Sequence, residues 1–298
     1  MVHCYIPTPD GKHRQGERLR GPVQWRRECE TLYTMIIMRK REVSMPFTLA
    51  HPAIALPLSK YTRYFSMTAL VLGSMSPDFE YFINFAVKRT IGHTFIGMFV
   101  MDIPLVILFS LVFHLIVKIP LLRHLPSPLS EWYYPYTLTR WHITKLSRML
   151  VFVYSSLIGT LTHIIWDGFT HSNALFVQKI CILNQFFSVG VYKIPVYKIL
   201  QHGSSLLGLI AIFLFLLGIR CKEVSVERLS KGRKLYFWLT ILTITVSLLI
   251  ITNITYQFDS LIQLFGKLVT SFISSVSVGV ILSCVIFRVR ASKNNHCV

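Results

Sequence analysis

The chain has 298 residues, of which 53% are hydrophobic and only 15% are charged, with a mean hydropathy of +0.53. Soluble domains average about a quarter charged residues, so this composition excludes an ordinary soluble domain and predicts a multi-span membrane protein. The net charge is +18, but the basic residues mostly separate the apolar windows, as cytoplasmic loops do, and no nucleic-acid partner is expected. The six cysteines form no CxxC pair and predict no disulfide framework.

Three regions follow from the patterning. Residues 1–44 are polar and basic and predict a disordered tail, either native or the product of an upstream start codon. Residues 45–220 form the predicted membrane core, and 221–298 a C-terminal pair of transmembrane helices. The fold class expected is an all-α polytopic bundle of about five or six helices with a short N-terminal helical hairpin. Apolar windows long enough to span a membrane occur near 94–117, 148–167, 203–220, 236–254 and 267–288.

The N-terminal hairpin comes from two apolar stretches, 48–58 and 64–75, on either side of the polar turn at 59–63. Each stretch is too short to cross a bilayer at about 1.5 Å per residue, so a re-entrant or interfacial hairpin is expected. Such a hairpin returns the chain to its starting level. It would place His51 and Asp78 near the same end.

The segment 73–82, GSMSPDFEYF, carries two acids in an aromatic setting. Asp78 is either a metal ligand or a helix cap. Glu80 is a ligand, a partner of a ligand, or an interfacial acid. His93 follows at the head of the first clear span.

Within and after that span, four more polar residues are expected to have other roles. Asp102 precedes Pro104, where a kink can expose it, and a backbone or hydroxyl partner is favoured over a metal. His114 lies about 30 Å along a straight helix from His93 and is expected to be structural. His124 and His142 lie in a basic, aromatic loop and are expected on a solvated face.

The segment 157–171, LIGTLTHIIWDGFTH, is apolar but carries His163, Asp167 and His171 at spacings of four. At about 100° per residue they share one face within about 80° of arc. His163 and Asp167 are spaced as an i, i+4 pair of metal ligands, and the alternative is a polar cluster that holds helices together. A fully helical segment separates His163 from His171 by about 12 Å, so either a break at Gly168 returns His171 or the stripe serves two metals.

The last motif is QHGSS at 201–205, at the predicted start of a helix. His202 would be a further ligand. Gln201, Gly203 and Ser204, with Lys193 and Lys198 upstream, would bind an anionic group. A simple serine N-cap is the alternative.

The predicted membrane sidedness places the candidate ligands on one face of the membrane. If the basic loops at 118–147 and 220–234 are cytoplasmic, then Asp78, His93, His171 and His202 all fall on the opposite face. Mixed histidine and carboxylate ligands predict a divalent metal, with Zn²⁺ favoured over Mn²⁺ or Fe²⁺.

At MPFTLAHPAIALPL, LGSMSPDFEYF, GHTFIGMFVMDIPL, LIGTLTHIIWDGFTH and YKILQHGSSLLG the chain resembles a bacterial integral-membrane family defined by a domain of unknown function. More loosely it is similar to inner-membrane metal-dependent hydrolases and to zinc-dependent phospholipase C, although it has no second HxxxE motif of the soluble phospholipases. The resemblance implies a metal site at His51, Asp78, His93, His163, Asp167, His171 and His202, with Glu80 in doubt.

These observations favour a hydrolase of the bacterial cytoplasmic membrane that cleaves a lipid-derived ester or phosphoester at the non-cytoplasmic face. Asp78 or Glu80, if not a ligand, would be the general base. The partner expected is membrane lipid. The alternative is a non-catalytic transporter or assembly factor in which the same polar residues line a path or join helices.

Overall fold

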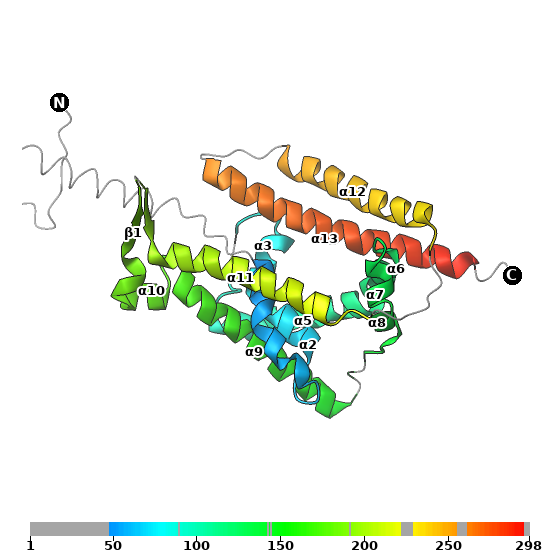
Figure 1. The fold of residues 1–298 in the computed structure, drawn as a ribbon, viewed down its shortest axis with the longest axis horizontal. Helices are drawn as coiled ribbons and strands as arrows, with labels where there is room; N and C mark the ends of the chain where they lie inside the picture. The colour runs from blue at the N-terminus through cyan, green and yellow to red at the C-terminus, as the bar shows by residue number, and fades with distance from the viewer. Residues whose placement is uncertain are drawn as a thin grey trace, which may run out of the picture. The chain divides into compact units, whose positions relative to one another are not determined.

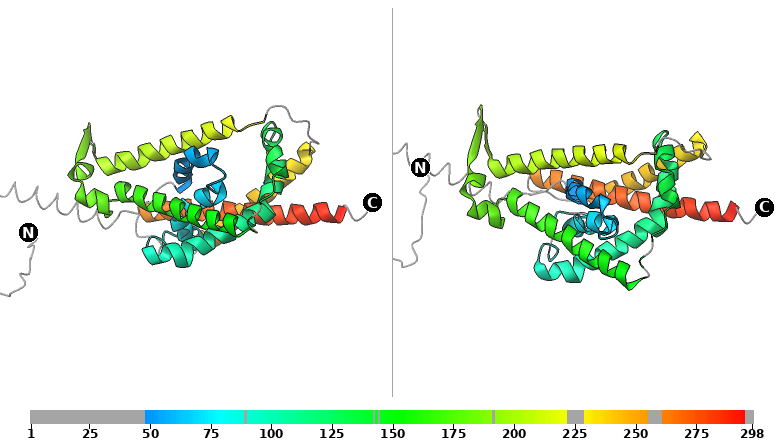
Figure 2. Two further views of the ribbon diagram at one scale, coloured as in Figure 1. Left: turned by 90° about the horizontal axis from the view of Figure 1, so that it is seen from below. Right: turned by 60° about the horizontal axis from the view of Figure 1, so that its bottom comes forward.

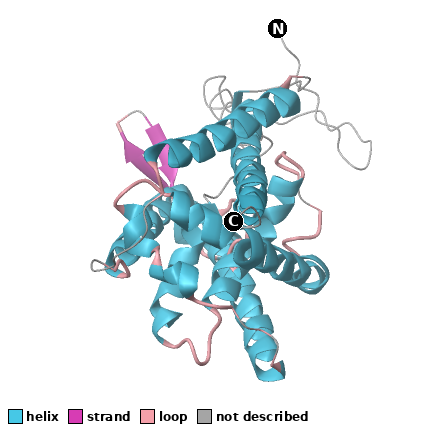
Figure 3. Cartoon of the chain, turned by 90° about the vertical axis from the view of Figure 1, so that its right-hand side faces the viewer, coloured by secondary structure: helices cyan, strands magenta, loops and turns pink. Residues whose placement is uncertain are grey.

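The computed structural model describes residues 48–88, 90–141, 143, 145–190, 192–221, 229–254 and 261–294. The predicted N-terminal tail, 1–44, lies outside the described residues. The described chain is helical apart from one two-stranded antiparallel sheet (Figure 3), so the predicted all-α class is confirmed.

The first half of the chain consists of short helices that lead into one long broken one. Its elements are η1 (Thr48–Lys60), α2 (Met67–Gly73), η2 (Ser76–Asp78), α3 (Phe79–Ile83), α4 (Phe95–Gly97), η3 (Met98–Asp102), α5 (Ile103–Val112), η4 (Phe113–Val117), α6 (Lys118–His124), α7 (Leu129–Tyr133) and α8 (Pro135–Leu138). The segments η1, η2 and η5 are 3₁₀ helices, whereas η3 and η4 are π-helical turns within the first long helix.

The second half is dominated by long helices. Its elements are α9 (Leu146–Thr170), α10 (Leu175–Lys179), η5 (Cys181–Asn184), β1 (Phe186–Val189), β2 (Tyr192–Pro195), α11 (Val196–Gly218), α12 (Lys231–Asn253) and α13 (Leu261–Asn294). The strands pair with Phe186 opposite Pro195 and form a hairpin beside α10 (Figure 2). The sequence predicted only a mixed loop there.

In the part of the chain that the structure describes, five helices are long and apolar enough to cross a membrane, which supports a membrane protein and agrees with the predicted five or six helices. They cover Phe95–His124, Leu146–Lys179, Val196–Gly218, Lys231–Asn253 and Gln263–Arg288. Most extend beyond the predicted windows, because a helix keeps its backbone hydrogen bonds as it continues into polar flanking residues.

The N-terminal hairpin is present as predicted: η1 and α2 pack on each other on either side of a turn near Arg63. Pro52 and Pro57 remove backbone donors inside η1, and it forms a 3₁₀ helix. Ser66 caps α2 by accepting a hydrogen bond from the Ala69 amide.

Glycines let α2 lie directly against α9. A Cβ at Gly159 would stand 2.5 Å from the Leu70 carbonyl oxygen, and a Cβ at Gly73 would stand 2.4 Å from that of Ser156. Only glycine permits this approach, and it brings the backbone of Ser74, at the end of α2, beside the buried face of α9.

The long helices alternate in direction. At one end the hydroxyls of Tyr133 and Tyr136 donate to the carbonyls of Leu216 and Ile219, which end α11. At the other end the Lys267 ammonium, near the start of α13, donates to the Phe85 carbonyl. These contacts define the two ends of the bundle. Helices α12 and α13 lie side by side along its length (Figure 1).

One prediction about the loop end is wrong. His124 does not lie on a solvated face: it is 7% exposed, its ring stacks on Phe237 at 4.4 Å, and its Nδ1 bonds the Pro120 carbonyl. The reason is that α12 and α13 cover α6, a packing that the local sequence does not reveal. His142 lies outside the described residues.

Candidate metal centre

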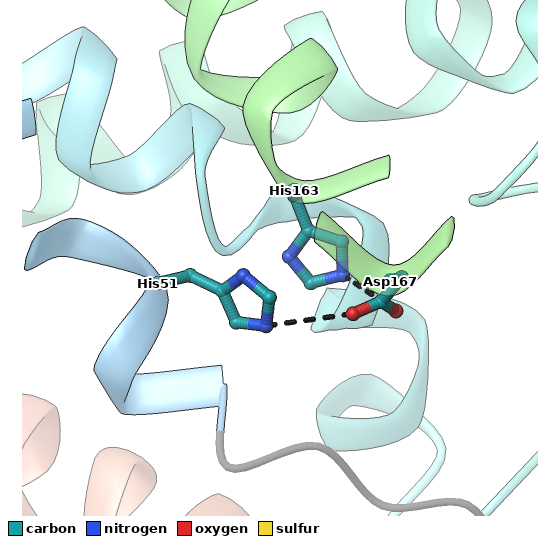
Figure 4. A group of neighbouring side chains, drawn as sticks. All are labelled: His51, His163 and Asp167. Carbon is teal, nitrogen blue, oxygen red and sulfur yellow. Dashed lines mark ion pairs between the residues drawn. The ribbon is translucent and has the colours of Figure 1, made fainter. Parts of the chain in front are cut away.

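Four elements bring five predicted ligands to one place. Helix α9 carries His163 and Asp167, one turn apart and both buried. His51 comes from η1, Asp78 from η2, and His93 from the loop before α4. Figure 4 shows His51 reaching across from η1 to Asp167, which also faces His163.

The candidate ligands form two overlapping groups, Asp78 with His93 and His163, and His51 with His163 and Asp167. Asp78 Oδ1 lies 3.5 Å from His93 Nε2 and 3.7 Å from His163 Nε2, and Asp167 Oδ2 lies 3.6 Å and 3.4 Å from the same two nitrogens. These distances exceed those of hydrogen bonds. Two ligands on a tetrahedral zinc ion with bonds near 2.0–2.1 Å stand about 3.3 Å apart, so the spacing suits a shared ion.

The second oxygen of Asp167 faces another pair of imidazoles. Asp167 Oδ1 lies 3.7 Å from His51 Nε2 and 3.8 Å from His171 Nδ1. The rings of His51 and His163 stack at 4.0 Å. Asp167 thus has one oxygen toward each set of histidines, the arrangement of a carboxylate that can bridge two ions.

The ligand atoms lack other partners. Asp78 Oδ1, both ring nitrogens of His93, His163 Nε2 and Asp167 Oδ1 are buried without a hydrogen bond. Each buried polar group left unsatisfied costs about 1–3 kcal/mol, and folded proteins contain few of them. Several such atoms at one point form a donor set that a divalent cation satisfies, and their chemistry fits zinc.

Outer contacts orient the ligands. His163 Nδ1 lies 2.8 Å from the Ser74 carbonyl oxygen, to which it can only donate, so the lone pair of a neutral ring is on Nε2 and faces the site. The Thr48 hydroxyl donates to Asp78 Oδ2 at 2.5 Å and leaves Oδ1 for the centre. Thr48 was not among the site residues predicted from the sequence. Its position one 3₁₀ turn before His51 could have indicated that it lies at the site.

Glu80 holds the loop that carries His93. Its Oε1 accepts from both the amide (2.6 Å) and the hydroxyl of Thr90, and its Oε2 accepts from the Gly92 amide at 3.2 Å. Burial would raise the pKa of Glu80, but these hydrogen bonds outweigh burial and lower it below the ordinary value. Both oxygens of Glu80 thus accept hydrogen bonds from the loop, so Glu80 is a positioning residue for His93.

Two further ionisable groups, His51 and Asp102, contribute to the charge of the site. Burial, reinforced by the neighbouring His163, lowers the pKa of His51 to about 3, so its ring is neutral and ready to bind a metal near neutral pH. Asp102 is fully buried in η3 and interacts electrostatically with Asp78 and Glu80. Neither of its oxygens has a hydrogen bond, so the expected backbone or hydroxyl partner is absent.

The suggested break at Gly168 is wrong. Helix α9 continues through Gly168 to Thr170, and the space of the missing Cβ is filled by the ring of Phe176. His171 returns by a different route: the chain leaves the helix there, and His171 Nδ1 lies 3.1 Å from the Asp167 carbonyl oxygen.

The QHGSS motif at 201–205 lies inside a helix, whereas the sequence predicted it at a helix start. Helix α11 begins at Val196, so Gly203 lies inside the helix and its amide is not one of the free donors of a helix start. Ser204 donates its hydroxyl to the Gln201 carbonyl. Among the described residues, the potential metal-binding groups do not include His202, which lines a separate pocket.

The two lysines that were predicted to bind an anionic group lie in different surroundings. Lys193 is exposed on β2. The Lys198 ammonium donates to Gln201 Oε1 at 3.1 Å. His114, by contrast, is packed as expected for a structural residue: its Nε2 bonds the Thr68 hydroxyl, and its ring stacks on Trp141.

Comparison with known proteins relates the chain to a family of unknown function. The family model described as Domain of unknown function (DUF4184) matches residues 45–286, which covers the hairpin, the candidate metal centre, four of the long helices and the fifth up to its last residues. No curated protein and no solved structure matches the chain.

Proposed function

We propose that this chain, which belongs to the DUF4184 family, is a membrane-embedded metal-dependent hydrolase that cleaves an ester or phosphoester of a membrane lipid. The observation that carries the proposal is a pair of overlapping groups, Asp78 with His93 and His163, and His51 with His163 and Asp167, in which several buried ligand atoms have no hydrogen-bond partner. A cluster that merely joined helices would pair these atoms with one another at hydrogen-bond distance. Here they stand at the spacing of ligands around an ion.

The reaction adds water across the ester, giving an acid and an alcohol. A Zn²⁺ ion bound here would polarise the carbonyl or phosphoryl oxygen and lower the pKa of bound water toward about 7. Asp102 is the proposed proton acceptor, because its oxygens are not engaged and it interacts electrostatically with the centre. Asp78 and Glu80, the bases considered from sequence, act instead as ligand and positioning residue.

Sidedness supports a site facing away from the cytoplasm. The end of the bundle that contains the metal centre also contains the start of α13 and Phe85. The opposite end includes Arg220 and Lys234, within the predicted cytoplasmic segments. We infer that the protein lies in a bacterial cytoplasmic membrane with its centre at the non-cytoplasmic surface.

The test is metal content. Full-length protein purified in detergent and measured by mass spectrometry should hold near-stoichiometric Zn²⁺, with a second equivalent if Asp167 bridges two ions. The double variant His163→Ala/Asp167→Ala should lose it. His114→Ala is the matched control, because His114 is a membrane-helix histidine with contacts of its own. A folded wild type that binds no Zn²⁺, Mn²⁺ or Fe²⁺ on reconstitution would overturn the proposal.

Hydrolysis is then tested on the metal-loaded protein. Phospholipid vesicles and a panel of soluble phosphodiesters and carboxylic esters should show product that depends on the metal and disappears in the double variant. Metal binding with no turnover on any substrate class would favour a non-catalytic metal protein. A transport path is less well supported. Asp102 and His114 are the two polar residues within the first long helix that a path could use, and His114 is packed against Thr68 and Trp141.

A further inference from the structure

A pocket of about 250 Å³ lies beside the metal centre. One wall is polar and comes from η1 and α11, including Thr48, Gln201 and Ser205. The facing wall is apolar and comes from α3 and α13, including Phe82, Val269 and Ile273. Ligand pockets generally occupy about 300–1,000 Å³, so this one suits part of an amphiphilic molecule.

The pocket adjoins the metal centre directly. Thr48 lines the pocket and donates its hydroxyl to Asp78 Oδ2. Tyr81 also lines it, and its ring centroid lies 6.2 Å from that of His93. A molecule seated in the pocket is therefore separated from the proposed ligands by a single side chain.

Gln201 supplies a buried donor in the polar wall. It is 3% exposed, and its Nε2 has no hydrogen-bond partner. The orientation of the amide is set by the Lys198 ammonium, which can only donate and bonds Gln201 Oε1. A buried amide NH₂ without an acceptor is costly, and an oxygen of a bound molecule would satisfy it.

The pocket also lies near the starts of two candidate membrane spans. Gln201 is about 8 Å along the helix from the start of the Val196 span, and Val269 is about 9 Å from the start of the Gln263 span. Phe265 lines the pocket and is 70% exposed on a helix that spans the membrane, so the pocket borders the lipid region. That depth is where the head groups and acyl chains of a bilayer meet.

We propose that this pocket binds the ester-proximal part of one acyl chain of a membrane phospholipid, with Gln201 Nε2 donating to the ester oxygen. The apolar wall on α3 and α13 receives the chain, while Thr48 and Gln201 hold its polar end beside the metal centre. The assignment rests on the proposed hydrolase function for the choice of an ester-bearing lipid. It identifies the substrate class as an acyl lipid that enters laterally from the bilayer.

The test is photolabelling of the metal-loaded full chain in vesicles of phosphatidylethanolamine and phosphatidylglycerol. A trace of phosphatidylethanolamine carries a diazirine near the ester of one acyl chain, and labelled peptides are mapped by mass spectrometry. Label is expected on the peptide that contains Phe82. Val269→Trp should fill the pocket and reduce that label to background. Leu268→Trp, at a neighbouring exposed position outside the pocket wall, should leave it unchanged.

Gln201→Leu gives a second perturbation that does not depend on filling the pocket. Losing one hydrogen bond to the ester should lower the Phe82 label about two- to tenfold at limiting tracer. Equal Phe82 labelling in wild type, Val269→Trp and Gln201→Leu would overturn the pocket assignment. If metal content and hydrolysis are retained in that case, the proposed function still stands. Pocket-dependent labelling in a chain that holds no metal would support the lipid site while removing the hydrolase.

Discussion

Glu80→Gln separates two roles for the acid that follows the Ser76–Asp78 turn. If Glu80 were the general base, the amide would abolish hydrolysis and leave metal binding intact. The structure instead engages both of its oxygens with the Thr90–Gly92 loop, which carries His93. We therefore expect Glu80→Gln to weaken metal binding.

The magnitude follows from the contacts. The glutamine oxygen can still accept from Thr90, but its NH₂ cannot accept the Gly92 N–H, so one charge-assisted hydrogen bond is lost and two are weakened. Hydrogen bonds to a charged group contribute about 1.5–3 kcal/mol each. Loss of an outer-shell partner typically lowers metal affinity about 10- to 100-fold, and the same range is expected for Glu80→Gln.

The assay is competition for Zn²⁺ with a chelator, together with hydrogen exchange of the segment 88–94. Exchange should accelerate in Glu80→Gln. Glu131→Gln is the control, since Glu131 accepts hydrogen bonds from Ser127 and Ser130 in a different loop. Unchanged zinc affinity and exchange with complete loss of turnover would refute the positioning role and restore Glu80 as the base. The lowered pKa adds a pH dependence. The stability due to Glu80 should be present above its ordinary pKa and be lost as the pH falls through the lower folded value.

Four further perturbations test other features of the molecule. Asp102→Asn should retain the metal and lower turnover about 10²- to 10⁴-fold, and unchanged turnover would exclude Asp102 as proton acceptor. Gly159→Ala should lower stability by about 1–3 kcal/mol in detergent melts, because its Cβ would stand 2.5 Å from the Leu70 oxygen. Gly203→Ala, where a Cβ meets open space, should raise stability by about 0.5–1 kcal/mol. In the metal-free protein His51 has a pKa near 3, so the unfolded chain binds a proton that the folded one does not between about pH 6.5 and 3. Stability should therefore fall by about 1.4 kcal/mol per pH unit on acidification through that window, and His51→Gln should flatten this slope in melts at graded pH.

Features that depend on short-range periodicity can be predicted from the amino-acid sequence alone. The long apolar windows predicted the membrane helices, because a helix in a bilayer satisfies its own backbone whatever its neighbours. The spacing of His163 and Asp167 placed them on one face of α9, since residues four apart are adjacent on any α-helix. The two short arms of the hairpin followed from their length alone.

Which other residues join that pair depends on how the helices and loops pack in three dimensions. His51 and His93 reach Asp167 because η1 and the Thr90–Gly92 loop pack beside α9, whereas His202 on α11 faces a different pocket. The distinction between Asp78 as a proposed ligand and Glu80 as the residue that holds the Thr90–Gly92 loop depends on contacts that cross the fold. Such contacts arise from how helices pack, and sequence spacing carries no information about that packing once the chain leaves a single helix.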